Sequence, residues 1–192
     1  MPLPYRIARW VGALGVAALL CACASTTVTL TPEPNTPVCN PATSALVLWA
    51  PVWRANQKDV ESRETVAARG LDQFFSLPSC FASTRLQRVD KVTPKSIAAA
   101  LTSATPGYAK VVGIEVQELG PVVKLLSSAA LLEGGTEVLL RVTEYAPQSG
   151  EELRGFTVHW RQGGAGVVKG VTSLPQDLQS ALHAGLQPAA TQ

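Results

Sequence analysis

The sequence predicts a mixed α+β domain over about residues 44–187, with the order β-α-β-α, then an antiparallel β-meander and a C-terminal helix. Two stretches with helical spacing each follow a strand-like segment, and from Tyr108 onward the apolar spacing changes to two, with short glycine-containing turns. Helices in the first half and hairpins in the second favour one sheet with the helices packed on one of its faces.

The first half of this domain reads as strand, helix, strand, helix. The segment SALVLWAPVW alternates between two apolar sets and predicts the opening strand. Asp59 is placed to cap a helix that runs to about Ser76 and is stopped by Pro78. FASTRLQRV predicts a short second strand, and the pair Thr93-Pro94 predicts the start of a second helix.

The second half reads as a meander followed by a helix. Val112, Ile114 and Val116 alternate with polar neighbours, and the segments VVKLLSSAALL, TEVLLRVTEY and ELRGFTVHWRQ continue the strand pattern. After Ser173, apolar residues recur at helical spacing and predict the last helix. Residues 188–192 are expected to form a tail.

The N-terminus of the chain has the features of a secretory signal peptide. Two arginines precede an apolar run that ends at Leu20, and the first acidic residue is Glu33. The run has roughly ten residues, whereas a helix that spans a bilayer needs about 20. We therefore expect residues 1–22 to be removed rather than to anchor the chain as a helix.

The end of this segment, Leu20-Cys21-Ala22-Cys23, resembles the bacterial lipobox, with leucine three places before the modified cysteine. On this pattern Cys23 is the lipidated first residue of the mature protein. Two other interpretations are an ordinary signal peptide with incidental cysteines and a metal site. A structural metal site needs about four ligands, and the only two histidines, His159 and His183, lie far away in sequence.

Cleavage before Cys23 removes two of the 16 basic residues and none of the 14 acidic ones, so the mature chain carries no net charge. Neutrality argues against binding to nucleic acid, which depends on Lys and Arg contacts to phosphates. Attachment to the membrane is then expected through acyl chains on Cys23. Ala24 stands where an inner-membrane retention signal has aspartate, which favours the outer membrane, with the domain facing the periplasm.

With Cys21 removed and Cys23 acylated, Cys39 and Cys80 remain, and in an oxidising compartment they are expected to form a disulfide. Two unpaired buried thiols are the alternative. Residues 23–43, rich in proline and threonine, are expected to act as an extended tether of about 3 Å per residue, reaching roughly 45 Å from Cys23 to Cys39.

No catalytic, cofactor-binding or metal-binding motif is evident. The glycines at 163–166 follow a strand and are explained by a loop. Glu151 and Glu152 are adjacent, so a strand would point their side chains to opposite faces. His159 and His183 each stand alone. We expect no cofactor and no metal, and an enzyme is unsupported.

One candidate surface for a protein partner is formed by Trp49, Trp53 and Arg54, because exposed tryptophan and arginine are favoured at interaction hot spots. The alternative is that both tryptophans pack under a helix. The last strand of the meander could also leave an open edge for pairing with another chain.

The order of these segments resembles the periplasmic domain of the curli-secretion CsgG family, the amino-terminal domain of TolB and the LpoB-type lipoprotein activators of penicillin-binding proteins. ALVLWAPVW, VAARGLDQFF, STRLQRVD, YAKVVGIEVQELG and TEVLLRVTEYAPQSGEELRGFTVHW carry the resemblance, over roughly residues 44–162. It implies the fold and a role in the cell envelope, and it transfers no functional residue.

Three function classes follow. The first is a non-enzymatic, lipid-anchored accessory or scaffold of a cell-envelope complex, with another envelope protein as partner. The second is a module that binds a small ligand, lipid or glycan in an apolar pocket. The third is an enzyme, whose sign would be a buried acid or histidine with a strongly perturbed pKa. The oligomeric state is open.

Overall fold

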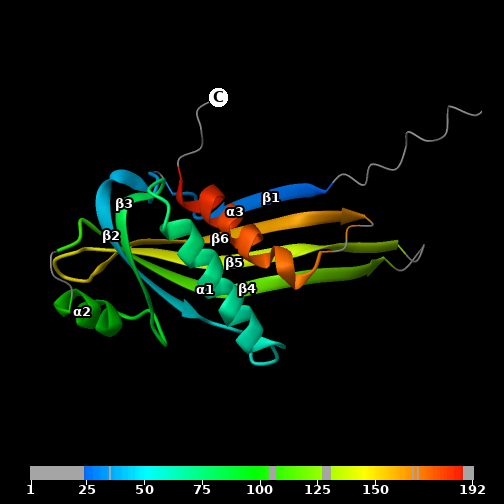
Figure 1. The fold of residues 1–192 in the computed structure, drawn as a ribbon, viewed down its shortest axis with the longest axis horizontal. Coiled ribbons are helices and arrows are strands. Elements are labelled where there is room, and N and C mark those ends of the chain that lie inside the picture. The colour runs from blue at the N-terminus through cyan, green and yellow to red at the C-terminus, as the bar shows by residue number, and fades with distance from the viewer. Residues whose placement is uncertain are drawn as a thin grey trace, which may run out of the picture.

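The computed structural model describes residues 24–34, 36–103, 107–126, 131–165, 167 and 169–187. These residues form a six-stranded sheet with three helices packed against it, the last of them C-terminal (Figure 1). The predicted fold class, α+β with β-α-β-α before a meander and a final helix, is confirmed.

The elements have the following bounds: β1 Ser25–Thr31, β2 Asn40–Pro51, α1 Val60–Phe75, β3 Phe81–Arg88, α2 Pro94–Thr102, β4 Lys110–Leu126, β5 Leu131–Tyr145, β6 Glu152–Ala165, a short 3-10 helix Val171–Ser173, and α3 Leu174–Leu186.

The strands lie in the order β1-β6-β5-β4-β2-β3. β2 runs parallel to both of its neighbours, β3 and β4, and the remaining pairs are antiparallel. Parallel neighbours need a crossover connection, and α1 and α2 supply the crossovers from β2 to β3 and from β3 to β4. The antiparallel strands β4, β5 and β6 are the expected meander.

Both faces of β2 are buried. Val47 and Trp49 belong to the large apolar cluster beneath α1 and α3, whereas Leu46 and Leu48 pack with Ile97 of α2. The helices therefore do not all share one face, as the sequence led us to expect, because α2 covers the opposite face. The reason is topological: the step from β2 to β3 and the step from β3 back to β4 run in opposite directions, and right-handed crossovers then place their helices on opposite faces.

Residues 25–31, which we expected within the tether, form strand β1. This strand pairs antiparallel with β6 from Ser25 opposite Gly163 to Thr31 opposite Thr157. Threonine, valine and leucine alternate here, and Leu30 packs against the large cluster. β1 also pairs with the edge of β6, so the last strand of the meander does not have the open edge that we expected. The two edge strands of the sheet are β1 and β3.

The helix starts agree only partly with the expected caps. Thr93 and Ser96 form a reciprocal capping box at the start of α2. Asp59 precedes α1 but its side chain makes no capping hydrogen bond, and its backbone is left-handed with a φ of 56°. In the turn before β6, Gly150 has a φ of 71°, a conformation that favours glycine.

Along its strands the sheet has two ends, called the anchor end, after the proposed anchor at Cys23, and the distal end. The anchor end is the row of paired residues Ser25, Gly163, Gly135 and Val122. The distal end is the row of Leu46, Val111, Tyr145 and Glu152. Figure 1 shows β4 and β5 projecting beyond β1 at the first end, and α2 lying at the other.

Candidate functional site

The proposed lipidation site, Cys23, lies outside the described residues, and the description begins with Ala24. What the structure adds is the position of the next residue. Ser25 opens β1 and is paired with Gly163 of β6. Any group attached to Cys23 is thus two residues from a fixed point on the sheet, at most about 7 Å along the chain.

A polar row and two glycine rows separate this end of the sheet from the core. The large apolar cluster reaches the row of Leu119, Val138 and Trp160. The next core-facing row has Thr26, Gln162 and Thr136, and Gln162 Nε2 donates a hydrogen bond to Thr26 Oγ1 at 3.1 Å. Thr136 Oγ1 is buried, with no hydrogen-bond partner in the described part of the chain.

Beyond that row, β5 and β6 are in close backbone contact at their glycines. A Cβ atom on Gly135 would lie 2.4 Å from the Gln162 carbonyl oxygen, and one on Gly163 would lie 2.4 Å from the Gly134 carbonyl oxygen. Alanine at either position would therefore push β5 and β6 apart.

The start of β2 is held by a covalent bond and by α3. Cys39 and Cys80 form a disulfide whose Cα atoms are 4.5 Å apart, so the predicted bridge is confirmed. The backbone N–H groups of Val38 and Cys39 both donate to the Leu186 carbonyl oxygen, at 3.1 and 2.9 Å. The segment between β1 and β2 is therefore fixed to the domain at its C-terminal end.

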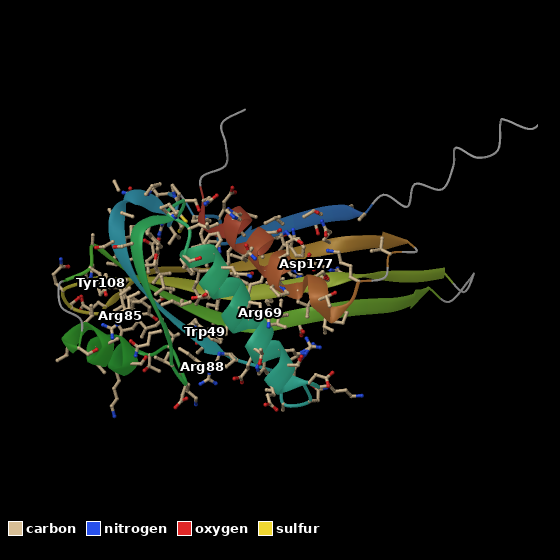
Figure 2. The ribbon with its side chains drawn as sticks, viewed as in Figure 1. Trp49, Arg69, Arg85, Arg88, Tyr108 and Asp177 are labelled. Atoms are coloured by element: carbon tan, nitrogen blue, oxygen red, sulfur yellow. A yellow bond between two sulfur atoms is a disulfide. The ribbon has the colours of Figure 1, made fainter. Side chains whose placement is uncertain are left out.

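Trp49 does not contribute to a partner surface. Its side chain is 3% exposed and lies in the cluster beneath α1 and α3, with the Arg88 guanidinium 5.9 Å from the ring centroid (Figure 2). β2 is a central strand covered on both faces, and for such a strand apolar alternation does not distinguish an exposed side from a buried one. For Trp49, the alternative that the tryptophan packs in the core under a helix is therefore the correct one.

Trp53 and Arg54 line an open hollow at the end of β2. Trp53 is partly buried against the large cluster, and its Nε1 atom is buried without a hydrogen-bond partner among the described residues. The hollow has a volume of about 430 Å³. Its lining consists of Val52, Trp53, Arg54, Gln117, Glu118, Glu137 and Leu139.

Arg54 is the exposed member of an ion-pair network at this hollow. Its side chain is 69% exposed and pairs with Glu118, which is 12% exposed. Glu118 follows a bulge in β4 and also accepts a hydrogen bond from Arg63 of α1 at 3.1 Å. Arg63 donates further to the carbonyl oxygens of Leu119 and Lys58. The network fixes the loop between β2 and α1 against β4, and leaves one guanidinium open to solvent.

His159 lies on β6, next to β5 in the sheet, and it is not isolated as the sequence suggested. Its Nε2 atom lies 2.5 Å from Glu137 Oε1, and Glu137 also lines the hollow. The missed signal was strand register, because Glu137 and His159 lie on adjacent strands and are 22 positions apart in sequence. The other histidine, His183, packs edge-on against Phe74 at 4.8 Å between ring centroids.

The buried acids are paired with bases. Glu144 accepts from Lys110 Nζ at 2.7 Å and from Arg154, and Asp177 accepts from Lys169 Nζ at 2.7 Å. Burial, followed by the charge of Glu152, raises the pKa of Tyr145 above its ordinary value. Within the described ranges, no three His, Cys, Asp or Glu side chains gather as metal ligands would.

No helix in the described part of the chain is long and apolar enough to cross a membrane.

No protein-family model and no curated protein sequence matches the chain. Among solved structures, a PelC dodecamer from Paraburkholderia phytofirmans is similar over 86% of this chain and 100% of its own, with 16% identity and a TM-score of 0.48. A putative neuraminyllactose-binding hemagglutinin homologue from Helicobacter pylori is similar over 79% of this chain and 86% of its own, with 13% identity and a TM-score of 0.41.

The lipoprotein GNA1162 from Neisseria meningitidis is similar over 73% of this chain and 96% of its own, with 15% identity and a TM-score of 0.37. Likenesses at this level assign no family and no function to the chain. The resemblance to the CsgG, TolB and LpoB domains stays a prediction.

Proposed function

We propose that this protein is a non-enzymatic lipoprotein of the outer membrane that faces the periplasm and acts as an accessory or scaffold of a cell-envelope complex. The observation that carries the proposal is the lipobox-like segment Leu20–Cys23 followed, two residues later, by a strand of the folded domain. An acyl anchor on Cys23 would hold the domain close to the bilayer, with about 33 Å of sheet, ten residues of β5, between the anchor end and the distal end.

The side chains of the domain support a binding role rather than catalysis. Glu144 and Asp177, the two acids that are buried among the described residues, are each paired with basic side chains. The hollow beside Trp53 is open and carries both apolar residues, Val52 and Leu139, and the exposed guanidinium of Arg54. Such a mixture is common at protein interfaces.

We assign the partner contact to this hollow, with Arg54 and Leu139 in place of Trp49. The test is site-specific photocrosslinking in cells that produce the full chain. A photoreactive residue at Arg54 and another at Leu139 should capture the same envelope protein. Leu77, which is 51% exposed and lies at another part of the surface, is the matched control and should not capture it.

Acylation is measured on the same cells. Cys23→Ala should abolish attachment of labelled fatty acid, and Cys21→Ala should leave it intact. If both hollow positions capture no defined product while Cys23 is acylated, the partner surface is wrong and the anchor remains. If fatty acid appears normally on the Cys23→Ala variant, the anchor itself is wrong.

A further inference from the structure

The anchor end of the sheet brings two separate segments to the same side of the molecule. β1 enters the sheet there at Ser25, so the chain that precedes it arrives from that side. The β4–β5 hairpin leaves the sheet on the same side, because Gly163 is paired with Gly135 and Gly135 with Val122. Figure 1 shows these two strands extending past the start of β1.

The hairpin reaches farther than Cys23 does. β4 and β5 remain in register beyond the anchor row as far as Leu126 opposite Leu131. Four residues of antiparallel strand add about 14 Å. Cys23 lies two positions before Ser25, a distance of at most about 7 Å. The paired strands therefore extend at least about 7 Å beyond Cys23. Amphipathic helices that lie in a membrane interface bury their apolar face to a similar depth, about 5–10 Å.

The sequence of this extension is mostly apolar. Beyond the anchor row, β4 contributes Val123, Leu125 and Leu126, and β5 contributes Leu131 and Leu132. Along the strands, other residues separate them from the core. The polar row of Thr26, Gln162 and Thr136 and the glycine rows lie between, and Lys124 is opposite Glu133 just before the leucines. A second apolar segment, separated from the core by polar residues, indicates a second apolar environment.

We propose that the end of the β4–β5 hairpin, residues 122–126 and 131–132, enters the interfacial layer of the bilayer that holds the acyl chains of Cys23. The inference rests on the proposed anchor. The occupant is lipid, because the register places the hairpin end at the depth where acyl chains attached two residues before Ser25 would begin.

The consequence is a fixed orientation. An acyl anchor alone holds one point at the edge strand β1 and lets the domain tilt. β5 and β4 lie two and three strands away from β1 in the sheet, respectively, so the hairpin end supplies a second contact. Two contacts hold the strands at a steep angle to the membrane plane. The distal end and α2 then point away from the membrane.

The test uses the lipidated full-length product, purified and reconstituted into vesicles of phosphatidylcholine and phosphatidylglycerol, with or without bromine on the acyl chains. Leu125→Trp and, separately, Leu132→Trp place a fluorophore on each strand of the hairpin end. Leu153→Trp, at the start of β6 and 64% exposed, is the matched control near the distal end. Brominated lipid should quench most of the added emission of both hairpin variants and none of the control's.

The mass of the N-terminal peptide is measured on each sample, so that the two proposals fail separately. Unquenched emission from both hairpin variants, in protein whose Cys23 carries acyl chains, overturns the hairpin contact and leaves the proposed function standing. A blue-shifted but unquenched signal together with self-association shows that a second copy covers the hairpin, and also overturns it. An unmodified Cys23 overturns both.

Discussion

The two ends of the sheet are stabilised by different means. At the distal end, Leu46 and Tyr145 are buried with residues of α2, and Glu144 is paired with two bases. At the anchor end, the core gives way to a polar row, and Gly135 and Gly163 let the strands approach by their backbones. The packing that stabilises the fold is therefore concentrated at the distal end and in the helix-covered middle of the sheet, and we propose that the anchor end serves attachment.

The largest expected effect is at the disulfide, which ties the start of β2 to the start of β3. Replacing both cysteines, Cys39→Ser with Cys80→Ser, should lower the free energy of unfolding by about 4 kcal/mol. The reason is that the disulfide joins residues 41 positions apart and so restricts the conformational entropy of the unfolded chain. Denaturant unfolding of the purified protein measures it. Reduction of the unmutated protein is the control and should give a similar loss. An unchanged midpoint in both would show that the bridge does not stabilise the domain.

The next effect compares a leucine at each end. Leu46→Ala removes a fully buried side chain from the cluster under α2 and should cost about 2–5 kcal/mol of unfolding free energy. Leu125→Ala, in the hairpin end, should change it by less than about 0.5 kcal/mol. Equal losses from the two changes would contradict the difference between the ends, since both would then be core positions.

A smaller effect tests the backbone contact at the anchor end. Gly135→Ala should destabilise the protein by about 1–3 kcal/mol, because its new methyl group would overlap the Gln162 carbonyl. Gly170→Ala is the matched control. Among the described residues other than its chain neighbours, the nearest atom to its added Cβ is Thr172 Oγ1 at 3.9 Å, so the expected change is within about 0.5 kcal/mol. Identical thermal unfolding of the two variants would show that β5 and β6 separate there without cost.

The smallest effect is a dependence on alkaline pH at the distal end. Burial raises the pKa of Tyr145, so the folded state favours the neutral phenol. This contribution is fully present below the unfolded-state pKa of about 10 and is lost as the pH rises through the folded value. Tyr145→Phe should therefore lose less stability than the unmutated protein when unfolding is measured between about pH 9 and pH 11. Parallel pH profiles would contradict it.

The sequence predicted most of the fold, and the misses have physical causes. The order of helices and strands from β2 to α3 followed from spacing and from turn residues. β1 was missed because Pro32 and Pro34 and the many threonines suggested an extended tether. The available signal was the alternation from Thr27 to Thr31, whose β-branched residues favour a strand.

The candidate site was harder to predict than the fold. Cys39 and Cys80 could be paired by elimination, and the structure contains that bond. Trp49 could not be placed, because a strand buried on both faces is apolar throughout. The hollow beside Trp53 depends on a β4 bulge and on the neighbouring strand β5, and neither can be read from local spacing.

The segment after Cys23 is part of the sheet and not a free tether. Hydrogen–deuterium exchange of the lipidated protein tests it directly, through peptides that cover residues 24–31. Because β1 is an edge strand, its alternate amides should be protected by pairing with β6, and the turn amides of Gln148 and Ser149 serve as the rapidly exchanging reference. Exchange of every amide in residues 25–31 at the rate of an unfolded chain would contradict the account.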